Sequence, residues 1–291
     1  MSAIDGILLV DKPEGPTSHD VVAMARRALR TKRVGHTGTL DPFASGLLVL
    51  CLGSSTRLAE YLSGLPKSYS ATIRLGVATT TDDSTGESIS TGDASGVSRE
   101  ALLEALAAQV GEIDQLPPFF SAKKVEGERM YEAARRGEVV ERKPSRVTIT
   151  SIDLIAYDPP MAEIDVECGS GTYIRSIARD VGESLGVGGH LTQLRRTRVG
   201  THDVADAVTV EQLADEAAVR RAFRPPSAAV AHLPSLVLED AGVAALKHGR
   251  AVPHAGTVPA GGPIALLGAA GELLAIGERI GDDVQPRKVF L

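Results

Sequence analysis

The spacing of apolar residues changes along the chain, and each kind of spacing predicts a kind of element. Short apolar runs, or alternation of apolar and polar positions, predict strands at residues 7–10, 47–52, 69–77, 147–157 and 162–168. Apolar residues three or four positions apart predict helices at 18–29, 98–110 and 174–185. Residues 79–96 fit neither spacing, and we expect a polar loop there.

Side chains with capping potential precede two of these helices. Thr17 and Asp20 have the spacing of a capping box, in which each side chain binds a backbone amide of the other. Thr172 follows two glycines and can cap the next helix. The loop between strand and helix would then deliver Tyr173 and Arg175 to the helix start.

The chain divides into two unequal parts. A linker rich in Pro and Ala at 224–235 separates a large region from a tail in which apolar runs predict a hairpin. A charged segment with one predicted short helix interrupts the large region and has the character of an insertion. We expect a catalytic domain at 1–230, an insertion at about 119–146, and a small β-rich domain at 231–291.

This order of elements predicts an α+β fold. A mixed, mostly antiparallel sheet with helices on its faces accommodates strands that alternate irregularly with helices. The composition, with 43% hydrophobic and 23% charged residues, is that of a folded globular protein. No apolar run is long enough to span a bilayer, and we expect a cytoplasmic monomer with no membrane partner. The two cysteines, Cys51 and Cys168, lie in apolar stretches and are expected to be buried thiols.

The net charge of -6 argues against a polyanionic partner if charge is spread evenly. The cations are clustered instead, around 26–33, 123–146 and 195–198, while acids dominate 82–93. Clustering makes local basic surfaces available for RNA. From charge alone, three ordinary solvated faces remain a better interpretation of these clusters than an RNA-binding surface.

Residues 35–46, with the sequence GHTGTLDPFASG, have the densest turn signals in the chain. Glycines, small hydroxyls and an Asp-Pro step specify a tight loop whose backbone can approach a ligand closely. An isolated Asp41 would more often be a turn former than a catalyst, and His36 alone would more often be structural. The loop is neither a P-loop nor a dinucleotide-binding fingerprint.

This loop and several other segments together resemble the TruB family of tRNA pseudouridine synthases. The matching blocks run in order over roughly residues 4–230, and blocks of this number and order rarely coincide by chance. They are GILLVDKP at 6–13, TSHDVV at 17–22, the loop at 35–46, KSY at 67–69, GTYIR at 171–175, and HL with LRRT at 190–197.

The resemblance implies roles for individual residues. Asp41 would be the catalytic aspartate, Tyr69 would stack on the target uracil and help move the C5 proton, and Arg175 would pair with Asp41. His36 would fill the space that the flipped base leaves in the T-loop, and Leu194 would line the uracil pocket. Substrate contacts are further expected from Tyr173 and from three cations of the insertion, which would act as a thumb on the T-arm of tRNA: Arg135, Arg136 and Arg142. The small C-terminal domain would be PUA-like, an expectation that rests on position and β-rich pattern.

The chemistry of the reaction agrees with these residue types. Converting uridine to its C-glycoside cuts the C1'–N1 bond and joins C5 to C1', so positive charge develops at C1' as in glycosidases. One carboxylate should suffice, because the uracil anion spreads its charge over two carbonyls and stays in the pocket. Whether that carboxylate attacks C1' or starts a glycal pathway is open at this stage. The sequence has no metal-ligand spacing and no phosphate loop, so we expect no cofactor and no metal, and full activity in EDTA.

Two other functions remain open from the residues. The protein could bind and refold RNA with a structural Asp41, or it could be a glycosylase that uses the same carboxylate to release the base. Free uracil would identify the glycosylase, while binding without product would identify the RNA-folding protein.

Overall fold

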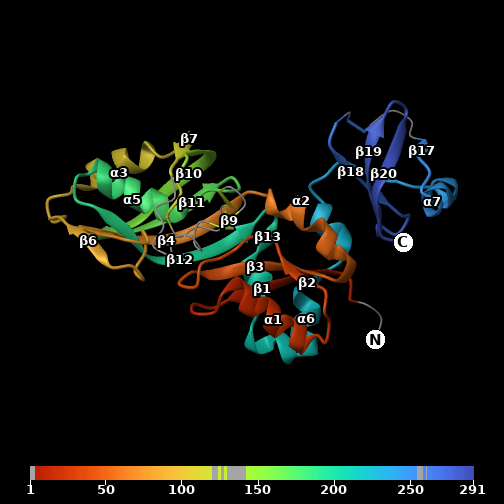
Figure 1. Ribbon diagram of the computed structural model, residues 1–291, viewed down its shortest axis with the longest axis horizontal. Helices are drawn as coiled ribbons and strands as arrows, with labels where there is room; N and C mark the ends of the chain where they lie inside the picture. Colours follow the sequence, from red (N-terminus) through yellow and green to blue (C-terminus); the bar gives the residue numbers. More distant parts are fainter. Residues whose placement is uncertain (1–3, 120–123, 126–127, 130–141, 254–257, 260) are drawn as a thin grey trace.

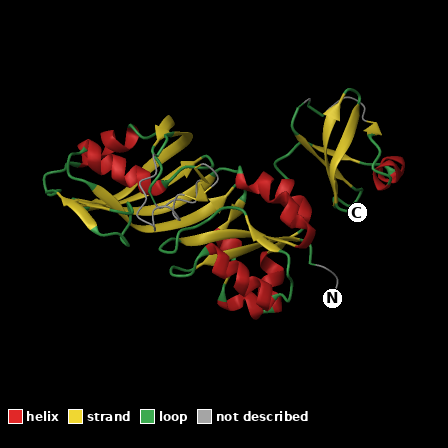
Figure 2. Cartoon of the chain, in the orientation of Figure 1, coloured by secondary structure: helices red, strands yellow, loops and turns green. Residues whose placement is uncertain are grey.

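The computed structural model describes residues 4–119, 124–125, 128–129, 142–253, 258–259 and 261–291. Its largest unit is an 11-stranded sheet with helices on its faces (Figures 1 and 2). The main path of the sheet runs β14 (Val208–Thr209), β1 (Gly6–Lys12), β3 (Ser45–Leu52), β12 (Gly189–Val199), β4 (Lys67–Leu75), β11 (Met161–Cys168), β10 (Ser145–Asp158) and β7 (Gly111–Gln115).

Three short strands pair at the margins: β2 (Val34–His36) with β3, β13 (His202–Asp203) with β12, and β15 (Phe223–Arg224) with β1. The pairs β1–β14 and β12–β3 are parallel, and the other pairs of this sheet are antiparallel. The prediction of a mixed, mostly antiparallel α+β fold is therefore confirmed.

The two halves of the sheet are covered differently. β1 and β3 are buried at almost every position, because α1 (Ser18–Ala28), α6 (Glu216–Ala222) and the segment after β3 enclose them. β4 and β11 alternate between buried and exposed positions, since α3 (Arg99–Ala107) and α5 (Ile174–Ser184) cover only one of their faces. Residues at odd positions of β4 thus point into the covered core.

A second sheet lies beyond the linker, in the order β16 (Ser235–Val237), β18 (Pro263–Leu267), β19 (Leu273–Ile280), β20 (Asp283–Val289) and β17 (Val252–Pro253). α7 (Asp240–Lys247) packs beside it, and α2 (Ala59–Ser63) follows the short helical turn Gly53–Leu58 in the main unit. The guanidinium of Arg57 donates to the Val289 carbonyl at 2.8 Å and lies over the Phe290 ring. The predicted hairpin and the β-rich tail are confirmed, while the exact division at residue 230 stays a prediction.

Two local expectations were wrong. The segment expected as a polar loop contains a small antiparallel hairpin, β5 (Val77–Thr79) with β6 (Ser88–Thr91). Both strands are short, and β6 is exposed at every position, so the segment gave no strand signal. Thr172 does not cap α5, because its hydroxyl donates to the Gly169 carbonyl and the N-cap residue is Tyr173.

The remaining expectations concern the insertion, the capping box and the cysteines. The capping box at Thr17 and Asp20 is formed, and both cysteines are buried and free. In the insertion, β8 (Lys124–Val125) pairs with β9 (Glu128–Arg129). The short helix predicted near 130–136 lies outside the described residues. Within the described part of the chain, no helix is long and apolar enough to cross a membrane.

Candidate active site

The loop between β2 and β3 carries Asp41 and is held in place from several sides. The Leu40 amide donates to the Ser18 hydroxyl at 2.9 Å, and that hydroxyl donates back to the Leu40 carbonyl at 3.1 Å. The ammonium of Lys12, which is fully buried, donates to the carbonyls of Ala44 at 2.7 Å and Pro42 at 3.4 Å. The loop is therefore rigid on both sides of Asp41, as a positioned catalytic group requires.

A cavity of about 270 Å³ opens beside this loop. Its walls come from five separate parts of the chain: the loop itself, the end of α2, strand β4, the start of α5 and strand β12. The lining includes Asp41, Lys67, Tyr69, Tyr173, Arg175, Leu194 and Arg196. The structure thus brings together five of the residues expected at the site. The first and the last of them, Asp41 and Leu194, lie more than 150 positions apart in the sequence.

Arg175 is the central ion-pair partner in this site. Its guanidinium contacts the Asp41 carboxylate at 3.0 Å and the Asp83 carboxylate at 3.3 Å, and it donates to the Thr81 carbonyl at 2.9 Å. The Arg175 and Asp83 side chains are 4% and 5% exposed, whereas Asp41 is 35% exposed. One buried guanidinium therefore orients one carboxylate toward the cavity and is itself anchored by a second, deeper carboxylate.

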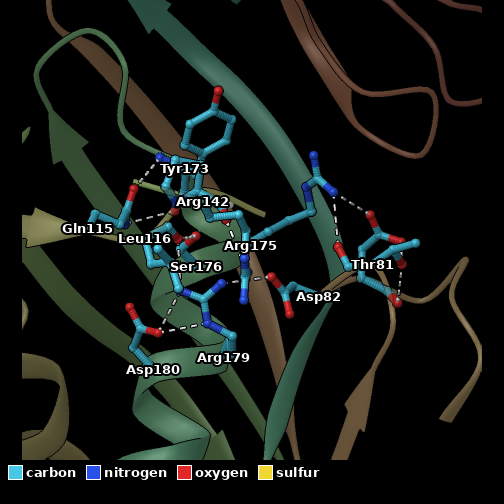
Figure 3. A network of polar contacts seen from close by, with 12 residues as sticks. Thr81, Asp82, Gln115, Leu116, Arg142, Tyr173, Arg175, Ser176, Arg179 and Asp180 are labelled. Atoms are coloured by element: carbon cyan, nitrogen blue, oxygen red, sulfur yellow. Dashed lines mark hydrogen bonds and ion pairs between the residues drawn. The ribbon is translucent and has the colours of Figure 1, made fainter. Parts of the chain in front are cut away.

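The next turn of α5 repeats this arrangement (Figure 3). Arg179, four residues after Arg175, pairs with Asp82 at 3.0 Å and with Asp180 at 2.8 Å, and it donates to the Leu116 carbonyl at 2.9 Å. Residues four apart lie on the same face of a helix, so adjacent acids of the 82–83 turn each meet one arginine. Asp82 has a φ of 60°, the left-handed conformation that non-glycine residues rarely adopt. This second pair fixes the turn that holds Arg175.

Tyr69 lines the cavity from strand β4. In the β4–β12 register Tyr69 stands directly opposite Arg196, and Ala71 stands opposite Leu194, so these side chains share one face of the sheet. The charge of Arg196 partly offsets the rise in the pKa of the Tyr69 phenol that burial causes. Tyr69 and Leu194 are 9% and 6% exposed and give this wall its apolar surface.

The ionisable groups of the cavity have shifted pKa values. Burial raises the pKa of the Asp41 carboxyl, the charge of Arg175 opposes that shift, and the charge of Asp83 adds to it. Burial also raises the pKa of the Tyr69 phenol, so its hydroxyl keeps its proton at neutral pH. Burial lowers the pKa of Lys12 and of Lys67 to about 8 in each case.

Two other predicted site residues that the structure describes, His36 and Arg142, do not line the cavity. His36, at the end of β2, is half-buried and meets His19 edge to face with ring centroids 5.2 Å apart. Arg142 donates to the Pro117 carbonyl at 3.2 Å and stacks on the Phe119 ring at 3.7 Å. Arg135 and Arg136 lie outside the described residues.

Four site residues were given no role from the sequence: Lys12, Lys67, Asp83 and Arg196. Lys12, Lys67 and Arg196 belong to blocks that resemble the family, so that resemblance was the signal that could have found them. Asp83 had no signal, because an aspartate in an acidic, polar segment is usually solvated. In the described part of the chain, no cluster of three or more His, Cys, Asp or Glu side chains could hold a metal ion.

Comparisons with solved structures agree with the observed fold. The chain superposes with a TM-score of 0.76 and 30% identity on a structure titled the archaeal box H/ACA sRNP Nop10-Cbf5 complex, over 98% of this chain and 86% of that one. A structure of an H/ACA RNP bound to a substrate RNA containing 2'-deoxyuridine gives a TM-score of 0.77 and 28% identity, with 98% and 85% covered.

Sequence comparisons then define the class. The model of the TruB family pseudouridylate synthase N-terminal domain matches residues 26–174, and that of the tRNA pseudouridylate synthase B C-terminal domain matches residues 175–231. The protein is a pseudouridine synthase, which is an isomerase.

Relatives named tRNA pseudouridine synthase B match over most of their length. The protein from Symbiobacterium thermophilum is 47% identical over 85% of this chain and 83% of its own. The protein from Arthrobacter sp. is 44% identical over 99% and 97%. The chain belongs to the TruB family.

Proposed function

We propose that this protein converts uridine 55 in the T-loop of tRNA to pseudouridine, with Asp41 as the carboxylate that acts at C1'. The observation that carries the proposal is the placement of Asp41, which the buried Arg175 holds at a cavity that Tyr69 and Leu194 also line. The names of the relatives support tRNA as the substrate.

The reaction needs a charged group on one side of the nucleotide and an apolar surface on the other. When the C1'–N1 bond breaks, its electron pair leaves with the uracil and the sugar becomes electron-poor at C1'. The Asp41 carboxylate stabilises that centre. C5 then supplies the electron pair of the new bond to C1', and the proton that C5 loses is balanced by the proton that N1 gains. An apolar wall excludes water, which would otherwise hydrolyse the separated sugar.

Tyr69 and His36 take different parts in handling the base. Tyr69 stacks on the extruded uracil inside the cavity, and its hydroxyl helps to move the C5 proton. His36 lies outside the cavity at the start of the Asp41 loop, where it can fill the space that the base leaves in the T-loop. Extruding a base costs about a few kcal/mol, and a side chain that fills the gap lowers that cost.

The insertion and the C-terminal unit contribute to RNA binding in this proposal. Arg135, Arg136 and Arg142 contact phosphates of the T-arm, and Tyr173 contacts the substrate from the start of α5. Such contacts add affinity and shape recognition more than base readout. The protein acts as a monomer in the cytoplasm, with no cofactor and with tRNA as its partner.

Single-turnover reaction with an unmodified tRNA transcript in EDTA tests this function. Base-resolved mapping should find pseudouridine at position 55 alone, and a transcript with cytidine at that position should give none. Release of free uracil would identify a glycosylase, and tight binding without any product would identify an RNA-folding protein.

A further inference from the structure

Two cations in the cavity are placed differently from Arg175. Lys67 and Arg196, which we call the cationic wall, line the cavity at the start of β4 and on β12. Lys67 lies two residues before Tyr69 on the same face of β4, and Arg196 is the cross-strand neighbour of Tyr69. The cationic wall therefore surrounds the side chain proposed to stack on the uracil.

Backbone carbonyls hold both side chains. The Lys67 ammonium donates to the carbonyls of Leu65 at 2.6 Å and Ser63 at 2.8 Å, at the end of α2. The Arg196 guanidinium donates to the carbonyls of Leu47 at 2.7 Å and Gly38 at 3.1 Å. Among the residues that the structure describes, no carboxylate forms an ion pair with either cation.

Both cations reach the Asp41 loop at one point. A Cβ atom built on Gly38 would lie 3.4 Å from a terminal nitrogen of Arg196 and 3.9 Å from Cε of Lys67. Lys67 is 8% exposed and Arg196 is 2% exposed, so their charges are largely shielded from water. Burying charge without a counter-ion costs free energy, and such groups concentrate at sites where a ligand supplies the opposite charge.

We propose that the cationic wall stabilises the negative charge that develops on the uracil when the C1'–N1 bond breaks. This inference rests on the proposed function, and it gives the two halves of the cleaved nucleoside separate partners. Asp41 faces the electron-poor sugar, while Lys67 and Arg196 face the base that has taken the bonding pair. Fixed charges in a site shielded from water act strongly on charge that appears only in the transition state.

Substitution of Lys67 by glutamine removes the charge selectively. The amide of Lys67→Gln still offers two N–H donors for the Ser63 and Leu65 carbonyls, so the change removes charge more than hydrogen bonds. Lys12→Gln is the matched control, because Lys12 is also a buried lysine held by carbonyls but does not line the cavity. Lys67→Met is measured in the same way if the glutamine variant does not fold.

The readout compares RNA stem-loops that carry uridine or 5-fluorouridine at the target position. Fluorine withdraws electron density and stabilises the departing base, so less stabilisation is needed from the protein. Lys67→Gln should slow single-turnover C1'–N1 cleavage about 10²-fold for uridine, and by a factor at least three-fold smaller for 5-fluorouridine. Lys12→Gln should slow both substrates by the same factor, and RNA affinity should be unchanged in Lys67→Gln.

Three outcomes would overturn the inference. Equal rate losses for the two RNAs in Lys67→Gln would give Lys67 a structural role. Weaker binding with an unchanged cleavage rate would mean that the cationic wall holds a phosphate of the target nucleotide instead of the uracil. If the wild-type protein cleaved neither RNA, the proposed function itself would be overturned. This outcome is distinct from the others because it is seen without any variant.

Discussion

The cavity has two charged sides that are built in different ways. On one side, the charge of Arg175 is matched by carboxylates at 3.0 and 3.3 Å. On the other side, Lys67 and Arg196 are held by carbonyls alone within the described chain. Carboxylates in contact with a guanidinium fix its geometry and cancel its positive charge, whereas cations held only by carbonyls keep their charge available for a ligand. In the proposed mechanism, the first side orients the Asp41 carboxylate and the second stabilises the departing base.

Asp41→Asn should have the largest effect, because it removes the carboxylate that pairs with Arg175 and that is proposed to act at C1'. Asparagine keeps the volume and most of the turn hydrogen bonds but is a feeble nucleophile. Losing about 5 kcal/mol of stabilisation would slow pseudouridine formation on the order of 10⁴-fold, while tRNA affinity is retained. Both quantities are measured on one preparation whose melting temperature matches wild type. Near-normal product formation would remove Asp41 from the mechanism.

Tyr69→Phe tests the proposed proton-transfer role of Tyr69, which lies beside the cationic wall. Phenylalanine keeps the ring for stacking but removes the hydroxyl, and Tyr69 is the cross-strand neighbour of Arg196. If that hydroxyl moves the C5 proton, the single-turnover rate should fall about 10²-fold with tRNA affinity unchanged. Full activity in this variant would leave stacking as the only role of Tyr69.

Asp83→Asn tests the side of the cavity where Arg175 pairs with Asp41 and Asp83, through the pH dependence of activity. The Asp41 carboxylate must be ionised to act, and its pKa is raised by burial, so activity should fall in acid from a pH above the ordinary range of an aspartate. Since the charge of Asp83 adds to that rise, Asp83→Asn should move the acid limb of log(kcat/KM) to lower pH. An acid limb that stays in place would show that Asp83 acts on the position of Arg175 alone.

Lys67→Gln should also change how the stability of the free protein depends on pH. The folded pKa of Lys67 is about 8 against an ordinary 10.5, so between these values the unfolded chain binds the extra proton. The free energy of unfolding of the wild type should therefore rise with pH across this window, by about 3 kcal/mol at most for this group. The variant should lack that rise, as should Lys12→Gln for its own part. Urea unfolding at pH 7.5 to 10 measures both differences, and parallel curves for all three proteins would contradict the shifts.

Local patterns were enough to predict five strands of the main sheet, namely β1, β3, β4, β10 and β11, but not the long strand β12. The apolar spacing along β4 and β11 predicted strands there, and the capping box predicted where α1 begins. These signals depend only on residues that are close in sequence, so they can be read from the sequence directly. The β5–β6 hairpin was missed because both strands are short and β6 is exposed at every position.

The candidate site shows what the sequence by itself determined and what only the tertiary structure decided. The turn chemistry of the 35–46 loop and the family blocks were sufficient to single out Asp41, Tyr69 and Arg175. The role of Asp83 depends on a partner far along the chain, because it meets Arg175 across 92 positions, and the role of Lys67 depends on its burial at the cavity. A charged side chain looks the same in a sequence whether water or a buried counter-ion surrounds it. Only the packing of α5 against the 81–83 turn, and the register of β4 with β12, decide which charges face the cavity.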